Sequence, residues 1–371
     1  MQAFIAESVI HTLSKRHPEK IYEFAGYYGQ ALHYSAFAVS SLITPSVQNY
    51  ITSKWLLIIA STLFAVYYLG FIHVTSFYFY LSQVLMGIGY SCKFSSTTTE
   101  KAPIFPNIPL HGLSNLIRVL KQLLVIAEQF KFAVLDTNVL LLTPFFAYMG
   151  LITSFLMSVY PTTLSFTASF SDDVYIIPIY SMSIGAAEIF GGIFLRRLIK
   201  KCQHWGLVVT ITTHFVFICS MLILVQLSVP EMSTIEPTAA AAMLIRPSRF
   251  VVIIIGFLLG LGDFTITTGR AVICQVAAPD FRMQVFSLSR VYQCVSSCIV
   301  LFLTPVMGIT SWTIVLAVGL AVGATTFAVV ARKTANNRKH RVAATETKET
   351  LASTDIEADR RFSGDRTTVN T

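Results

Sequence analysis

Charged side chains are scarce in this chain, and that scarcity decides its class. Of the 371 residues, 12% are charged and 54% are hydrophobic, and the mean hydropathy is +0.65. A soluble domain cannot cover so much apolar side chain with so little polar surface. The composition therefore predicts an integral membrane protein that crosses the lipid bilayer several times.

Signals of several other classes are missing as well. The sequence has no Asn-x-Ser/Thr acceptor for glycosylation, and no apolar segment of signal-peptide type follows Met1. The six cysteines lie in or beside apolar stretches without metal-ligand spacing, so we expect them to pack as small apolar side chains. We find no nucleophile paired with a base, no metal-ligand set and no phosphate-binding loop. The sequence therefore predicts neither an enzyme nor a bound cofactor or metal.

Long apolar runs are abundant instead. A helix rises about 1.5 Å per residue, so roughly 20 residues cross a hydrocarbon core about 30 Å thick. The runs are continuous in Leu, Ile, Val and Phe rather than alternating, which indicates helices and not a β-barrel. The predicted fold is an all-α, polytopic membrane helical bundle. Its nine expected spans are 29–50, 54–72, 74–91, 138–160, 174–195, 206–228, 250–272, 284–306 and 310–331.

The distribution of basic residues predicts the orientation. The net charge of +8 could suggest nucleic acid, but the Lys and Arg residues sort by loop, which argues against that partner. If the C-terminus faces the cytosol, 21 of the 27 lie on the cytosolic side, as the positive-inside rule requires. The first span is an exception, with Lys15, Arg16 and Lys20 on its outer flank and only Lys54 on its inner one. We therefore expect an upstream segment to be missing.

The spans divide the chain into five regions. Residues 1–28 form a non-cytosolic N-terminal segment, 29–91 a partial N-terminal helical half with three spans, and 138–331 a C-terminal half with six. The cytosolic linker 92–137 separates the halves. The tail 332–371 is rich in charged residues, Ser and Thr, which predicts a disordered cytosolic extension.

The linker also carries apolar residues at helical spacing, with basic and acidic residues between them. This pattern predicts an amphipathic helix at the membrane surface. Such a helix is suited to binding a partner or anionic lipid, although a plain tether on the inner leaflet is the more common role. The apolar positions are Leu113, Leu116, Ile117, Leu120, Leu123, Leu124, Ala127 and Phe130.

Six short stretches are individually weak signals but specific in their order and spacing. They are Ala25-Gly26-Tyr27-Tyr28-Gly29-Gln30, Thr44-Pro45-Ser46, Gly87-Ile88-Gly89, Ser158-Val159-Tyr160-Pro161-Thr162, Ile184-Gly185-Ala186-Ala187-Glu188-Ile189-Phe190-Gly191-Gly192 and Phe257-Leu258-Leu259-Gly260-Leu261-Gly262-Asp263. In these stretches the chain resembles the uncoordinated-93-like branch of the major facilitator superfamily, closest to its major-facilitator-domain-containing protein eleven subgroup. The basic loop of Arg196, Arg197, Lys200 and Lys201 is similar to the superfamily's inner-face motif.

The resemblance implies a fold of twelve helices, of which we expect this chain to lack the first, fifth and sixth. A splice form or an incomplete gene model would account for the difference. The implied function is transport of an unknown small solute or ion, with a truncated or inactive isoform left open. The alternative is a non-transporting regulator or trafficking partner of an ion channel or another membrane protein. Fold resemblance alone does not decide between these functions.

Three ionisable residues lie inside the apolar stretches: Glu188, Asp263 and Arg290. Such groups cost several kcal/mol in hydrocarbon unless they are paired or hydrated, so they mark a working site by default. Helical rise from the predicted span ends puts all three at a similar depth, and each acid stands in a stripe of small or polar residues. We hypothesise that Arg290 pairs with Glu188 or Asp263 in the bundle interior.

Two roles remain open for such a cluster. It could couple proton or ion movement to a substrate, because burial and a nearby cation hold a carboxylate close to a change of charge state. It could equally be a salt-bridge network that locks helices or shapes an inner gate. The histidines His33, His73 and His214 are expected to be packed or interfacial rather than proton relays.

Overall fold

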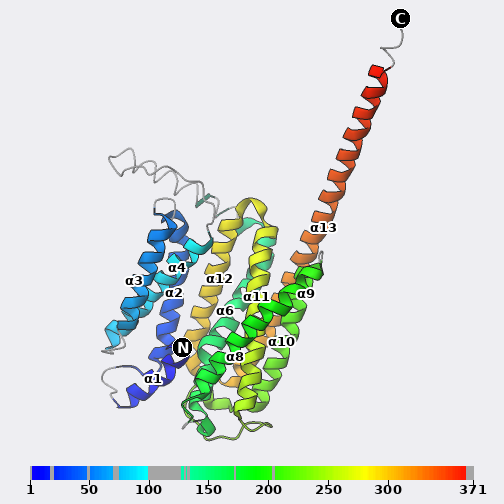
Figure 1. Cartoon of the computed structure of the whole chain (residues 1–371). Coiled ribbons are helices and arrows are strands. Elements are labelled where there is room, and N and C mark those ends of the chain that lie inside the picture. The colour runs from blue at the N-terminus through cyan, green and yellow to red at the C-terminus, as the bar shows by residue number, and fades with distance from the viewer. Residues whose placement is uncertain are drawn as a thin grey trace, which may run out of the picture.

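The fold is a bundle of helices from which one long helix projects (Figure 1). The computed structural model describes residues 2–16, 21–47, 51–69, 75–98, 127–128, 131, 134–170, 173–202 and 205–364. Its α-helices are α1 (Gln2–Arg16), α2 (Ala25–Val47), α3 (Ser53–Leu69), α4 (Ser76–Thr98), α6 (Thr137–Ser154), α7 (Tyr160–Phe166), α8 (Ile176–Phe190), α9 (Arg196–Lys201), α10 (Gly206–Ser228), α11 (Arg249–Ala277), α12 (Arg282–Leu303) and α13 (Ile309–Gly364).

Short turns of other helix types connect some of these elements. The π-helical turns η1 (Phe155–Val159) and η3 (Gly191–Leu195) join α6 to α7 and α8 to α9. The 3-10 turns are η2 (Ala168–Phe170), η5 (Glu231–Thr234), η6 (Pro279–Phe281) and η7 (Thr304–Val306). The predicted all-α polytopic bundle is confirmed.

Six helical stretches of the described chain are long and apolar enough to cross a membrane. They are Thr137–Phe166, Ile176–Leu195, Gly206–Ser228, Arg249–Ala277, Gln284–Val306 and Ile309–Asn336, and they correspond to the six spans predicted for the C-terminal half. Side-chain caps help to fix where two of them begin. Asp136 Oδ1 accepts hydrogen bonds from the backbone of Asn138 and Val139 before α6, and Ser248 Oγ accepts one from Val251 before α11.

The three remaining predicted spans correspond to α2, α3 and α4. The apolar helix α3 has only 17 residues. Helices α2 and α4 also carry polar side chains, several of which are buried in the bundle. Their buried polar residues include Gln30, Ser41, Thr44, Ser82, Gln83 and Ser91. Polar groups on such helices are tolerated where they face protein or a cavity.

The N-terminal and C-terminal helices form one body, joined mainly where α2 packs against α12. Tyr27 and Ala31 of α2 belong to the same apolar core as residues of the C-terminal helices. Ser35 Oγ lies 2.9 Å from Cys298 Sγ of α12, and Tyr27 Oη donates a hydrogen bond to the backbone oxygen of Thr234. Phe94 of α4 stacks on Phe286 with ring centroids 5.0 Å apart.

Small residues allow α11 to approach α8 closely. A Cβ atom on Gly260 would lie 2.7 Å from the backbone oxygen of Ile184, so only glycine fits there. The stripe of small or polar residues predicted beside Asp263 on α11 therefore does face another helix. On α8, by contrast, a Cβ on Gly185 would meet no atom within 4 Å in the described chain.

The segments predicted to be cytosolic gather at one end of the bundle, near the top of Figure 1. The start of α3, the end of α4, the short helix α9 and the α11–α12 turn all lie there, as does the point where α13 leaves the bundle. We call this the basic end. The turn η5 and the start of α11 lie at the opposite end. The amphipathic helix predicted in the linker falls almost entirely outside the described residues.

The C-terminal tail departs from the prediction, because α13 continues to Gly364. Residues 332–364 are helical here, whereas their polar composition predicted disorder. The segment contains no proline and no glycine before Gly364, and it continues a membrane helix that is already formed. Extension therefore avoids the unfavourable nucleation step that limits isolated helices. The segment projects away from the bundle, as expected for a stretch with few apolar side chains (Figure 1).

Candidate functional site

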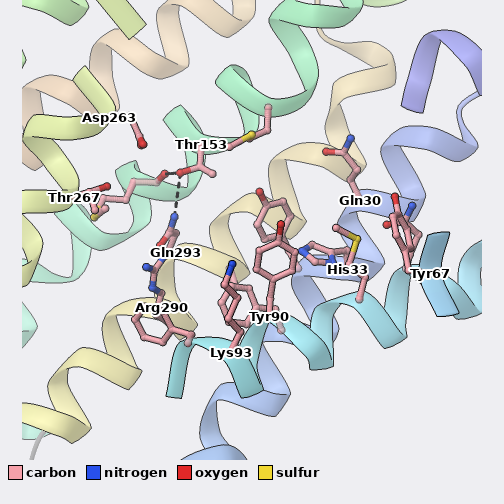
Figure 2. A pocket seen from close by; sticks show the side chains of 18 residues that line it. Gln30, His33, Tyr67, Tyr90, Lys93, Thr153, Asp263, Thr267, Arg290 and Gln293 are labelled. Carbon is pink, nitrogen blue, oxygen red and sulfur yellow. Dashed lines mark hydrogen bonds between the residues drawn. The ribbon is translucent and has the colours of Figure 1, made fainter. Parts of the chain in front are cut away.

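A cavity of about 420 Å³ lies between the N-terminal and C-terminal helices. This is within the size range of small-molecule sites, and such sites commonly form between the helices of a bundle. Figure 2 shows side chains from α2 and α4 facing side chains from α6, α11 and α12 across it. The lining residues are Gln30, His33, Tyr34, Phe37, Tyr67, Gln83, Met86, Tyr90, Lys93, Phe94, Met149, Thr153, Met157, Asp263, Thr267, Arg290, Gln293 and Cys294.

Gln293 of α12 is the centre of a hydrogen-bond network on the C-terminal side of the cavity. Its Oε1 accepts a hydrogen bond from Arg270 Nη1 at 2.7 Å and another from Arg290 Nη1 at 3.0 Å. Its Nε2 donates to Thr153 Oγ1 of α6 at 3.0 Å (Figure 2). One neutral side chain thus holds two guanidinium groups and links three helices.

Aromatic rings cover both guanidinium groups. Arg290 lies over the ring of Phe94 at 4.2 Å from its centroid, and Arg270 lies over Phe286 at 5.5 Å. The two rings stack on each other. Cation–π contacts of this kind stabilise a cation that has lost water. The contact between Arg290 and Phe94 also ties α4 to α12 at the cavity wall.

Asp263 lines the same cavity and is partly exposed to it. It is close enough to Glu188, Arg270 and Arg290 to interact with them electrostatically. However, no direct ion pair joins either arginine to an acid of the described residues. The predicted pairing of Arg290 with Glu188 or Asp263 is therefore not what the structure holds. The physical reason is that Gln293 lies one helical turn from Arg290 and takes its hydrogen bond instead.

Glu188 does not line the cavity. It is exposed on α8, a helix on which Met182 and Ile189 are exposed as well. Of the three charged residues predicted to form a cluster, the structure brings Asp263 and Arg290 to one cavity. Glu188 lies outside it and interacts with Asp263 only at a distance.

The sequence reasoning missed two residues of this site, Arg270 and Gln293. Arg270 lies near the end of the span predicted at 250–272, and among the basic residues above it counts as cytosolic, yet α11 continues to Ala277 and Arg270 is only 2% exposed. A signal was present, because Arg270 falls within the span predicted at 250–272. Gln293 was not predicted, because an uncharged amide is a weaker signal in an apolar span than an ionisable group. An amide nevertheless also needs hydrogen-bond partners in hydrocarbon.

Two of the three histidines can be placed. His214 is fully buried, with Nε2 2.9 Å from Tyr148 Oη and Nδ1 3.0 Å from the backbone oxygen of Gly262. It is thus a packed histidine, as predicted. His33 lines the cavity, and its ring packs against Tyr34 and Tyr90. His73 lies outside the described residues.

The predicted basic loop forms the short helix α9 at the basic end. Arg196, Arg197 and Lys201 are exposed there, and the side chain of Lys200 lies outside the described part. A second charged site lies at the opposite end, where Arg249 Nε contacts Asp173 Oδ2 at 2.6 Å. The hydrogen bond from Arg249 lowers the pKa of the Asp173 carboxyl.

The fold and the cavity together define a class, a multi-pass helical membrane protein with a solute-sized cavity between two sets of helices. Comparison with known families agrees with this class. Residues 17–98 and 114–328 match a family model described as "Ion channel regulatory protein UNC-93". The chain belongs to this UNC-93 family.

A more specific similarity covers part of the chain. Over 170 residues the sequence is 28% identical to "UNC93-like protein MFSD11" of Xenopus tropicalis. The alignment covers 44% of this chain and 38% of the relative. The predicted resemblance to the uncoordinated-93-like branch, near the eleven subgroup, is therefore confirmed.

Proposed function

We propose that this protein binds a small solute in the cavity between α2, α4, α6, α11 and α12 and carries it across the membrane. The observation that carries the proposal is the cavity itself. Residues from both sets of helices line it, and they include an acidic residue, Asp263, and a basic residue, Arg290. Solute sites in facilitator-type proteins lie between two helical units that move relative to each other.

Within this proposal Asp263 and Arg290 have different roles. Arg290 is held by Gln293 and Phe94, so it is positioned to bind a ligand group that enters the cavity. Asp263 has no ion-pair partner among the described residues and is partly open to the cavity. A carboxyl group in that position can gain or lose a proton as a solute arrives, which would couple solute movement to proton movement.

Flux in proteoliposomes that contain only this chain tests the proposal. We expect uptake from a mixed pool of labelled small solutes, reduced at least tenfold by Asp263→Asn. The matched control is Asp173→Asn, which neutralises an acid outside the cavity and should retain uptake. A well-folded chain that moves no solute from any pool would refute transport.

A second function has one observation in its favour. Glu188 lies exposed among apolar side chains on α8, and an acid on a membrane-facing surface calls for a polar partner. The family description refers to ion-channel regulation, so another membrane protein is a candidate for that partner. In this reading the chain regulates or escorts its partner without transport.

Crosslinking separates the two functions. A photo-crosslinker at Met182 of α8 should capture one membrane protein in fixed stoichiometry if the regulatory function is correct, and Glu188→Leu should reduce the yield. A crosslinker at Val318, exposed on α13, is the control. Equal capture at both positions, or none, would exclude a specific partner at α8.

We also propose that the basic end and the C-terminal tail face the cytosol. The support is the gathering of the basic loop segments at one end of the bundle (Figure 1). In sealed right-side-out vesicles, a cysteine at Ala240, at the opposite end, should then react with a membrane-impermeant reagent. A cysteine at Lys201 should react only after the vesicles are opened, and the reverse pattern would overturn the orientation.

A further inference from the structure

The cavity contains more positive charge than its protein partners neutralise, and this excess indicates the ligand. Arg270 and Arg290 both donate to the single oxygen Oε1 of Gln293. A glutamine oxygen is neutral, so it satisfies donors without neutralising either cation. Two guanidinium groups that share one acceptor also repel each other. Gln293 therefore leaves the positive charges of both arginines unbalanced.

The arginines also retain unused donors. The Nε atom of each is buried and has no hydrogen-bond partner among the residues that the structure describes. A guanidinium group has five N–H donors in one plane, and a buried donor without a partner costs free energy. Arg270 is 2% exposed, so bulk water does not provide that partner. A ligand that accepts hydrogen bonds beside these groups would recover this cost.

The geometry around Arg290 favours a planar anion. Arg290 Cζ lies over the ring of Phe94 at 4.2 Å from its centroid, so the ring packs against the guanidinium group. A carboxylate binds arginine along its N–H edge, often through two parallel hydrogen bonds. Phe94 and Gln293 thus hold Arg290 at the cavity wall, where such a ligand would bind.

Counting formal charges gives the charge of the ligand. Arg290 lines the cavity and Arg270 lies directly behind it, whereas Asp263 is the acid among the described lining residues. These two positive groups and one negative group leave an excess of one positive charge. A ligand with a single negative charge would balance it.

The rest of the wall indicates the body of the ligand. Beyond its charged groups the cavity is lined mainly by aromatic rings and methionine side chains, which favour an apolar or aromatic body. These residues are Tyr34, Phe37, Tyr67, Tyr90, Phe94, Met86, Met149 and Met157. A cavity of about 420 Å³ suits a small organic molecule rather than a bare inorganic ion.

We infer that the ligand of this cavity is an organic monocarboxylate with an aromatic or other apolar body, whose carboxylate binds at Arg290. This inference rests on the proposed function, because it names the class of solute that the cavity takes. It assigns the negative charge to the solute and leaves Asp263 to respond to proton movement.

Charged thiol reagents test the inference without knowledge of the natural ligand. The experiment uses the full chain with its six cysteines replaced, carrying Tyr90→Cys, in nanodiscs of uncharged phosphatidylcholine. Tyr90 lines the cavity one helical turn from Phe94. Its reaction rates with the anionic ethylsulfonate and the cationic ethyltrimethylammonium methanethiosulfonates are compared. Each is normalised to Ala240→Cys, an exposed position outside the cavity.

We expect the normalised anionic rate to exceed the cationic rate at least tenfold. Arg290→Gln should remove most of this preference, and Arg290→Lys should keep it because the charge remains. Elution of each variant as a single species on size exclusion shows that it is folded. In the same chain, 3-phenylpropanoate should slow the reaction, whereas 3-phenylpropanamide should not.

The outcomes separate this inference from the proposed function. Reaction at Tyr90→Cys without an anionic preference, or a preference that Arg290→Gln leaves unchanged, would overturn the monocarboxylate and leave a solute cavity in place. If no reagent reacted there while Ala240→Cys reacted fully, the cavity would be closed to solutes. The proposed function would then fail as well.

Discussion

Replacing Gly260 by alanine tests the close packing of α11 on α8. The added Cβ would lie 2.7 Å from the backbone oxygen of Ile184, 2.8 Å from Ala187 Cβ and 3.0 Å from Ile184 Cα. Ordinary contacts between such atoms lie at about 3.5–4.0 Å, so the helices must separate by roughly 1 Å. No rotamer change relieves the clash, because the obstacles are backbone atoms and a Cβ.

The expected cost follows from this geometry. Overpacking a well-packed contact typically costs about 1–3 kcal/mol. An unfolding entropy of about 2.1 cal/mol/K per residue gives a chain of this size a fall in melting temperature of roughly 1–1.5 °C per kcal/mol, or about 1–4 °C in all. The assay is thermal unfolding of the detergent-purified protein, followed by size-exclusion chromatography of the surviving fraction.

Gly185→Ala is the matched control, because it is also a glycine-to-alanine change in a membrane helix. A Cβ there would meet nothing within 4 Å in the described chain, and alanine favours a helix over glycine by up to about 1 kcal/mol. Its melting temperature should stay the same or rise. Equal melting temperatures for the two variants would refute the packing of α11 on α8 described above.

Three further predictions concern other contacts. Burial raises the pKa of the Glu7 carboxyl in α1 from 4.5 to about 8, so α1 docks with a neutral acid. Docking should be strongest below pH 4.5 and should weaken by about 1.4 kcal/mol per pH unit up to about pH 8. Protease cleavage of α1 at several pH values measures this change. An unchanged pH dependence in the Glu7→Gln variant would contradict the prediction. The Ser35→Cys variant should form a disulfide with native Cys298 on mild oxidation, because Ser35 Oγ lies 2.9 Å from Cys298 Sγ. The control variant Val39→Cys should not, because Val39 is exposed. Equal disulfide yields in the two variants would refute the contact of α2 with α12. The Gln293→Leu variant should be less stable by about 1–3 kcal/mol in the same melting assay, because two buried arginines lose their shared hydrogen-bond acceptor. An unchanged stability would show that the hydrogen-bond network of Gln293 contributes nothing.

Hydropathy alone predicted the membrane class and the places of the helices, because hydrocarbon thickness sets the length of each apolar run. It also identified Asp263 and Arg290, since an ion within a span is a strong signal. The direction in which a side chain points depends on neighbours distant in sequence. Glu188 and Asp263 stand in similar stripes of small residues, yet Asp263 faces the cavity and Glu188 does not.

Helix ends were the weaker part of the prediction. Arg270 lies only two residues before the end of the predicted span at 272, whereas α11 continues to Ala277 and Arg270 is buried. The same effect extends α13 to Gly364. In both cases an established helix continues into polar sequence, where composition gives no stop signal such as proline.

Calorimetric titration of 3-phenylpropanoate into the purified chain, in nanodiscs of uncharged lipid, tests the central claim most directly. Saturable binding is expected, at least tenfold weaker for 3-phenylpropanamide and for the Arg290→Gln variant. Arg249→Gln, which removes an arginine outside the cavity, should leave the affinity unchanged. If the amide bound as tightly as the carboxylate, or if Arg290→Gln bound like the unaltered chain, Arg290 would not be the anchor of an anionic solute.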